Sequence, residues 1–429
     1  MSIADRQPAT AATAATPRAG LAAWAALAAF GAYFCMYGFR KPFTAAGFEG
    51  GQVFGIGEKT ALVTAQVLGY AASKLIGVRV VAELRPSRRA AAIVGLVGVA
   101  EAALLLFAVA PSPWHVPCLF LNGLPLGMVF GLVLGFLEGR RLTEAMAAVL
   151  CASFILADGV AKSVGSWLLT LGVTERFMPG VAGLIFLPPL VGFVALLARV
   201  PPPDARDVAL RGDRATMDRR DRRALLSRHA AGLVPLVLAY VLVTIARSLR
   251  ADFAPEVWRG LGRAAAPATF TESETFVALA VLVVNGLAVL IVGNRRAFFA
   301  SLAVGIAGGA LMLVAPVVLR QGWLGGFAFM VLLGTGLYLP YVALQTTTFE
   351  RLLAMTRERG NLGFLVTIAD AAGYLAYVAV IVGEAAIPSS IDFFRFFLDA
   401  IAVLAALTIA SLAASWRAFA RPTADTASS

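Results

Sequence analysis

Twelve long apolar runs divide this 429-residue chain and constrain its fold more than any other feature. Each run has about 20 residues or more, which is enough to cross a hydrocarbon core of about 30 Å as a helix. Helix is the only suitable structure, because a strand in lipid would leave backbone groups unpaired. The runs lie at 21–47, 60–82, 90–110, 115–137, 144–170, 180–199, 230–257, 272–293, 297–319, 324–348, 361–383 and 392–416. The sequence therefore predicts an all-α membrane protein with twelve transmembrane helices.

The composition excludes an ordinary soluble protein. Only 14% of the residues are charged and 59% are hydrophobic, whereas soluble domains carry about 25% charged residues. The net charge of +11 would also suit a nucleic-acid-binding protein. However, the basic residues stand in short clusters between the apolar runs, which is the pattern of a membrane protein. We expect the lipid bilayer as a partner and no nucleic acid.

The distribution of basic residues predicts the orientation. If the N-terminus is inside, the inside segments carry 24 of the 36 lysines and arginines, and the outside loops carry six. Positive charge concentrates on the cytoplasmic side of membrane proteins. We therefore expect a multi-pass protein of the bacterial inner (plasma) membrane with both termini cytoplasmic.

The longest hydrophilic stretch, 200–229, separates the twelve runs into six and six. We interpret it as a linker that lies against acidic lipid headgroups. The expected parts of the chain are a cytoplasmic tail (1–20), an N-terminal six-helix bundle (21–199), a cytoplasmic linker (200–229), a C-terminal six-helix bundle (230–416) and a second tail (417–429). We expect a monomer.

A repeat relates the two halves. Glu138 precedes Asp158 by 20 residues, and Glu350 precedes Asp370 by the same 20. The tripeptide Leu-Ala-Asp that ends at Asp158 corresponds to Ile-Ala-Asp at Asp370. Parallel repeats in transporters are related by an axis along the membrane normal. The sequence thus predicts two pseudo-symmetric six-helix bundles.

Arginines at the ends of two apolar runs indicate a binding site. Arg40 and Arg250 occupy similar places in the two halves, and each is followed three residues later by phenylalanine. An arginine at membrane depth is costly and normally faces a protein interior or an aqueous cavity. A register shift of 207 residues instead aligns Tyr33 with Tyr240 and Arg40 with Arg247. Either Arg247 or Arg250 is therefore a candidate counterpart of Arg40.

Polar residues at helical spacing extend this candidate site. Within the spans, six basic residues stand against three acids (Glu101, Asp158 and Asp370), which predicts a net positive cavity. Arginine binds phosphate or carboxylate bidentately, so the expected ligand is a small organic anion. The predicted substrate-binding residues are Arg40, Lys41, Lys74, Arg247, Arg250, Tyr37, Tyr70, Tyr338, Tyr341, Gln345 and Tyr374.

The repeated aspartates suggest ion coupling. A carboxylate here can neutralise a basic neighbour or carry a coupled proton, and its partner decides which. Asp158 has Lys162 one turn away, so we expect an ionised counter-charge. Asp370 has Tyr374 there instead of a base, so it is the better candidate proton carrier. The expected coupling ion is a proton or inorganic phosphate.

Three segments carry a family resemblance. The segment Tyr37-Gly-Phe-Arg-Lys-Pro-Phe43 resembles span 1 of the organophosphate:phosphate antiporters of the major facilitator superfamily. Residues 69–77 resemble their span 2, and Ser-Leu-Arg250 followed by Pro255 resembles their span 7. The resemblance implies that Arg40 and Arg250 grip a phosphate and that Lys74 assists. The chain also resembles an uncharacterised bacterial membrane family with a domain of unknown function.

Two departures separate the chain from that subgroup. The span 5 histidine of the antiporters has no counterpart here, and Asp158 lies near its place. The loop after span 2 is Gly77-Val-Arg79 followed by Arg85-Pro-Ser-Arg-Arg89, without the aspartate typical of the superfamily. A proton-coupled carrier of another anion therefore remains open beside phosphate exchange.

Two functions are compatible with these patterns. The first is a secondary active transporter that moves a phosphorylated or carboxylated metabolite by alternating access. The alternative is a transporter-like membrane sensor that binds an organic anion and signals to a partner. We find no zinc motif, nucleophile elbow or aspartyl pair, so we expect no enzyme activity, cofactor or metal.

Overall fold

The computed structural model describes residues 16–137, 143–201, 219–263, 265–356, 363–385 and 392–420. Most of the expected tails and of the expected linker therefore lies outside the described residues.

Among its described residues, the N-terminal half contains six long helices. Between its first two long helices lie two 3₁₀ turns, η1 (Tyr37–Phe39) and η2 (Pro42–Ala45), and a hairpin of β1 (Gln52–Val53) and antiparallel β2 (Ile56–Gly57). A third 3₁₀ turn, η3 (Pro86–Arg88), follows the second helix. The helices are α1 (Thr16–Met36), α2 (Glu58–Glu83), α3 (Arg89–Val109), α4 (His115–Leu137), α5 (Thr143–Thr170) and α6 (Met178–Ala198).

The C-terminal half repeats this count with six more long helices. Two short helices, α9 (Ala254–Gly260) and α13 (Phe349–Thr356), and a π-helical segment, η4 (Leu344–Thr348), interrupt them. The long helices are α8 (Arg219–Asp252), α10 (Pro267–Val289), α11 (Asn294–Arg320), α12 (Gly326–Ala343), α14 (Gly363–Ala385) and α15 (Phe393–Ala420). Each of the twelve predicted spans corresponds to one of these long helices, although the first helix ends well before residue 47.

Eleven of the described spans are long and apolar enough to cross a membrane. The twelfth long helix, α2, has 26 residues and carries Gln66, Tyr70 and Lys74 along one face. These side chains point into the protein rather than into lipid, as their contacts below show. The fold is an all-α membrane architecture, as the sequence predicts.

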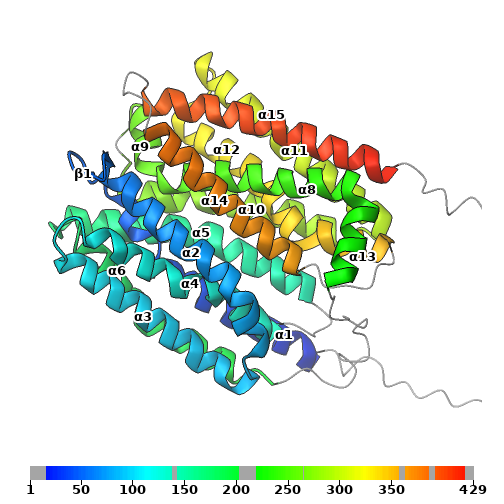
Figure 1. The fold of residues 1–429 in the computed structure, drawn as a ribbon, viewed down its shortest axis with the longest axis horizontal. Coiled ribbons are helices and arrows are strands. Elements are labelled where there is room, and N and C mark those ends of the chain that lie inside the picture. The colour runs from blue at the N-terminus through cyan, green and yellow to red at the C-terminus, as the bar shows by residue number, and fades with distance from the viewer. Residues whose placement is uncertain are drawn as a thin grey trace, which may run out of the picture.

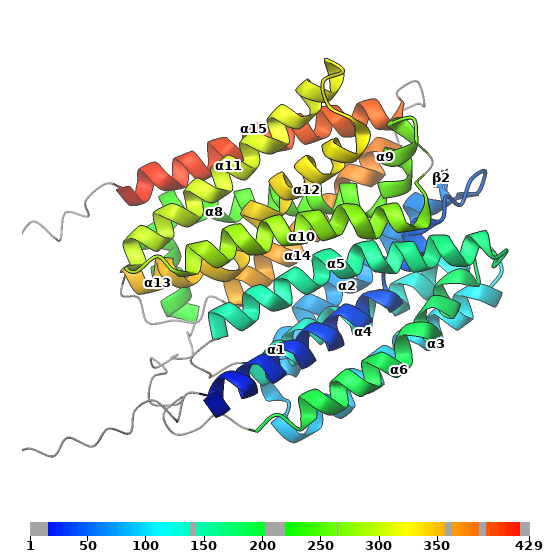
Figure 2. The same cartoon turned by 180° about the vertical axis from the view of Figure 1, so that it is seen from behind.

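The two halves lie side by side (Figures 1 and 2). They meet where α2 packs against α14 and α5 packs against α10. The start of α1 and the end of α15 lie at one end of the bundle, and the β-hairpin and α9 lie at the opposite end. We call the latter the hairpin end.

The helix expected over 21–47 ends early, at Met36. The chain continues as η1 and η2, with the backbone N–H of Arg40 donating to the carbonyl of Tyr37 at 3.0 Å. Two residues favour this change. Pro42 has no N–H to continue a helix, and at Gly38 a Cβ atom would lie 2.1 Å from the Phe186 ring. The turn brings the Arg40 side chain to the interface between the halves.

Close packing of α2 on α4 depends on glycine. A Cβ atom at Gly69 would lie 2.2 Å from the carbonyl oxygen of Phe120, and one at Gly123 would lie 2.1 Å from that of Gln66. Small residues allow such backbone contact between membrane helices. The contact fixes Gln66 and Tyr70, which belong to the site described below.

We expect Gly123→Ala to destabilise the protein by about 2 kcal/mol or more, because backbone atoms of α2 cannot move away without repacking. Thermal unfolding in detergent measures the effect. The matched control is Gly98→Ala on α3, where a new Cβ meets nothing within 4 Å and alanine has the higher helix propensity. Equal melting temperatures for the two variants would contradict the close α2–α4 contact.

Candidate functional site

The site is centred on Arg40, between the two halves. The guanidinium carbon of Arg40 lies 3.7 Å from the centre of the Tyr70 ring and 5.6 Å from that of Tyr374 on α14. The Arg40 side chain is only 3% exposed. The turn that carries it is held by Gln66, whose side-chain amide donates to the Arg40 carbonyl at 3.0 Å, and by Asn122, which donates to the Phe39 carbonyl at 3.0 Å.

Arg247 approaches the same tyrosine from α8. Its guanidinium donates to the Tyr374 hydroxyl at 3.0 Å, and its guanidinium carbon lies 4.6 Å from the Tyr341 ring centre and 5.8 Å from that of Tyr374. Arg247 is 4% exposed. One guanidinium group from each half therefore lies close to the Tyr374 ring.

Arg250 does not take part in this contact. It forms an ion pair with Glu274 of α10 at 2.8 Å and donates to the carbonyl of Met330 at 2.9 Å, both within the C-terminal half. The family resemblance implies that Arg250 acts together with Arg40, but another residue lies in that place. Arg247, three residues earlier and almost one turn away on α8, is the spatial counterpart of Arg40. At this point the two halves are related by the offset of 207 residues, which aligns Arg40 with Arg247.

Lys74 and Asp370 form an ion pair across the interface. The Lys74 ammonium lies 2.8 Å from the Asp370 carboxylate, which also accepts hydrogen bonds from Tyr240 at 3.0 Å and Tyr341 at 3.5 Å. The expectation that Asp370 has no basic partner is therefore wrong. Spacing along the sequence can reveal a basic residue only on the same helix as Asp370. Lys74 belongs to the other half of the chain.

A second charged cluster lies toward the hairpin end. Lys162 pairs with Asp158 as predicted, and Lys41 lies 3.6 Å from the same carboxylate. Lys41 also forms a buried ion pair with Asp252 at the end of α8, and Tyr377 donates to Asp252 at 3.0 Å. The sequence analysis missed Asp252, although it stands five residues after Arg247 in the same run.

The charge balance differs from the sequence-based count. Asp252 and Glu274 are buried besides the three predicted acids, at 4% and 5% exposed. Four carboxylates (Asp158, Asp252, Glu274 and Asp370) thereby pair with Lys41, Lys162, Arg250 and Lys74. Within the described part of the chain, Arg40 and Arg247 have no such ion pair. Three of their guanidinium nitrogens are buried without a hydrogen-bond partner.

Tyrosines surround these groups. All eight tyrosines of the chain are buried. Tyr37 lies 5.9 Å from the Arg40 guanidinium, and the rings of Tyr70 and Tyr374 meet edge-on at 5.1 Å. Tyr338 packs on Tyr341 and on Phe154 of the other half. The remaining predicted residue, Gln345, lies in η4 beside Cys151, with its amide oxygen 3.9 Å from the thiol sulfur.

Two further ion pairs join the halves nearer the hairpin end. Lys59, the second residue of α2, lies 2.6 Å from Glu256 of α9, and Arg259 of α9 lies 2.6 Å from Glu49. The sequence analysis assigned no role to these residues. Among the described residues, no three or more His, Cys, Asp or Glu side chains are grouped closely enough to hold a metal ion.

A family profile identifies the chain. Residues 42–422 match the family described as "Family of unknown function (DUF5690)". The chain belongs to this family. The match supports the resemblance to an uncharacterised membrane family and covers Lys74, Arg247, Tyr374 and Asp370 of the site, while Arg40 lies just before it. A search of curated proteins gives no match.

Solved structures of transporters share the fold of this DUF5690 protein. A D-xylose-proton symporter matches with a TM-score of 0.63 at 11% identity, over 93% of this chain and 97% of that one. A bacterial homologue of the human drug peptide transporters PepT1 and PepT2 matches with a TM-score of 0.61 at 10% identity, over 94% and 98%. A mutant of the nucleoside transporter NupG matches with a TM-score of 0.58 at 12% identity, over 93% and 100%. The fold is therefore that of the major facilitator superfamily.

Proposed function

We propose that this protein is a secondary active transporter that moves a small organic anion across a bacterial inner membrane by alternating access. The solute class is a phosphorylated or carboxylated metabolite. The observation that carries this proposal is the pair of buried guanidinium groups, Arg40 and Arg247, that contact Tyr374 without a carboxylate partner among the described residues.

Two uncompensated buried charges need a counter-charge. A buried cation is costly unless it is paired or hydrogen-bonded. Here cation–π contacts with Tyr70 and Tyr341 replace an ion pair, and such contacts contribute about 1–2 kcal/mol when desolvated. An anion with two negative charges would neutralise both arginines. A phosphate group or a dicarboxylate matches the planar fork of each guanidinium.

The position between the halves supports alternating access. An anion bound by Arg40 and Arg247 contacts both halves at once, so relative movement of the halves would expose it to either side. Opening at the hairpin end requires breaking the contacts of Lys41 with Asp252 and of Lys59 with Glu256. Rebuilding these ion pairs would close that end again.

The Lys74–Asp370 pair supports a coupling role beside the anion site. Protonation of Asp370 would release Lys74 for the solute, which makes a proton a suitable coupling ion. Exchange against inorganic phosphate, as in the organophosphate:phosphate antiporters that residues 37–43 resemble, is the second possibility. In that case phosphate would occupy Arg40, Arg247 and Lys74 on the return step.

Uptake into proteoliposomes tests the proposal. Purified protein is reconstituted, and the accumulation of labelled phosphorylated and carboxylated metabolites is compared with that of neutral sugars and cations. Parallel vesicles contain inorganic phosphate or have an imposed pH gradient. We expect one class of anion to accumulate. Either internal phosphate or the pH gradient should stimulate this accumulation.

The results of the uptake experiment distinguish an anion transporter from the alternatives. Accumulation of neutral sugars or cations without anions would overturn the anion assignment. Saturable anion binding in detergent without uptake under any condition would favour the transporter-like sensor.

A reporter fused after Ser429 checks the orientation, because the proposal expects a cytoplasmic signal there and a periplasmic signal would contradict it.

A further inference from the structure

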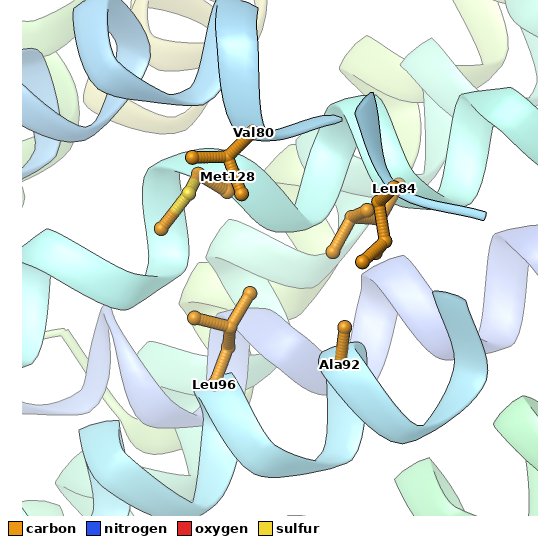
Figure 3. Close-up of a pocket in the computed structure, with 6 residues that line it drawn as sticks. Val80, Leu84, Ala92, Leu96 and Met128 are labelled. Carbon is orange, nitrogen blue, oxygen red and sulfur yellow. The ribbon is translucent and has the colours of Figure 1, made fainter. Parts of the chain in front are cut away.

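An apolar groove lies on the N-terminal half, away from the anion site. It has a volume of about 260 Å³ and is lined by Val80 and Leu84 of α2, Ala92 and Leu96 of α3, and Met128 and Leu132 of α4 (Figure 3). Val80 is 45% exposed, so the groove opens at the surface of the bundle. In a membrane this surface faces lipid.

One end of the groove is basic. Leu84 is followed directly by Arg85, and Arg88, the last residue of η3, directly precedes α3, on which Ala92 and Leu96 lie about one turn apart. Both arginines are exposed. The next residue, Arg89, donates to the carbonyl of Gly135 on α4 at 2.6 Å. The connection between α2 and α3 thus carries three arginines (Arg85, Arg88 and Arg89) between the lining residues Leu84 and Ala92.

Among the described residues, no acidic side chain neutralises these charges. Over the residues that the structure describes, none of the three arginines forms an ion pair with an acidic side chain, and the Nε atom of Arg89 is buried without a partner. The one acidic side chain beside them in sequence, Glu83, is exposed. A polar headgroup that carries negative charge would complement this end of the groove.

The dimensions suit a lipid. From Arg89, the first residue of α3, to Leu96 the helix rises about 10 Å, at 1.5 Å per residue. A phospholipid with its phosphate at Arg85 and Arg88 would lay part of one acyl chain between Leu84 and Leu96. Basic residues near a membrane surface attract acidic lipids. The apolar groove and the basic end are therefore matched to the two parts of one molecule.

We propose that this groove binds one anionic phospholipid, with an acyl chain among Leu84, Leu96 and Met128 and the headgroup phosphate at Arg85 and Arg88. The occupant also contacts α2, because Val80 and Leu84 line the groove. The site stands on geometry separate from the anion site and does not depend on the proposed transport activity.

Native mass spectrometry of the full-length protein tests the proposal. The protein is purified in detergent and equilibrated with equal amounts of phosphatidylglycerol and phosphatidylcholine, and the lipids that remain bound are counted. We expect roughly ten-fold preferential retention of one phosphatidylglycerol, in line with the attraction of two arginines. The double variant Arg85→Ala with Arg88→Ala should lose that lipid.

Two further variants separate the contributions. Arg295→Ala with Arg296→Ala removes the same charge at the start of α11, at the corresponding place in the other half, and should keep the lipid. Leu96→Trp fills the groove without changing charge and should lose it. Equal retention of the two lipids would overturn the proposal, as would unchanged phosphatidylglycerol binding in the Arg85/Arg88 variant.

A free anion must also be distinguished from a lipid. The same measurement with inorganic phosphate in place of lipid should give no binding that depends on Arg85 and Arg88. Binding of phosphate that the Arg85/Arg88 variant loses and that Leu96→Trp leaves unchanged would contradict a lipid site, because it would show that the apolar groove plays no part.

Discussion

Replacing Arg40 by lysine is expected to weaken anion binding roughly 100-fold, equivalent to about 2.7 kcal/mol. Lysine keeps the positive charge but cannot form two parallel hydrogen bonds to one phosphate or carboxylate group. Arg247→Lys should have an effect of similar size, because Arg247 contacts the same tyrosine from the other half. Equilibrium binding to the detergent-solubilised protein measures both.

Arg250→Lys is the matched control. Arg250 is equally buried, but it pairs with Glu274 within the C-terminal half. A lysine there can keep the ion pair while losing the hydrogen bond to the Met330 carbonyl. We expect a lower melting temperature and unchanged anion affinity. If Arg250→Lys lost binding and Arg247→Lys retained it, the assignment of Arg247 as the partner of Arg40 would be wrong.

Asp370→Asn is expected to tighten anion binding roughly ten-fold and to reduce its dependence on pH. The substitution removes the carboxylate that pairs with Lys74 at 2.8 Å, so the lysine becomes available to the solute. The proposed coupled proton on Asp370 would release Lys74 in the same way. Binding curves across a pH series, with the same anion for each variant, measure both effects.

Asp158→Asn is the comparison for this result. Asp158 contacts Lys41 and Lys162 in the cluster toward the hairpin end. Removing one partner from such a buried cluster typically destabilises a protein by about 3–5 kcal/mol. We therefore expect a large loss of stability with the pH dependence of binding retained. If only Asp158→Asn abolished the pH dependence, the coupling assignment to Asp370 would be reversed.

The sequence predicts the helices well because membrane spans depend on local composition. A run of about 20 apolar residues is sufficient evidence for a span, and the polar stripe of α2 was still recognisable at helical spacing. The i,i+4 pair of Asp158 and Lys162 was predictable for the same reason. These features need no knowledge of how the halves are arranged.

Contacts between the halves were not predictable from spacing. Lys74 pairs with Asp370 of the opposite half, and Lys41 pairs with Asp252 211 positions away. The choice between Arg247 and Arg250 also depends on packing, because both lie near the end of one helix. The local change from helix to 3₁₀ turn at Met36 was missed because one of its two causes, the packing of Phe186 against Gly38, is a tertiary contact.

The central claim is that one anion is held by Arg40 and Arg247 together. A double-mutant cycle tests it most directly, with anion affinity measured for the wild type, Arg40→Lys, Arg247→Lys and the double variant. The probes are inorganic phosphate and the best-transported anion of the uptake panel. We predict strongly non-additive losses, with the double variant little weaker than either single variant, because both arginines act on one ligand. Strictly additive losses, or a loss confined to one of the two arginines, would contradict the claim.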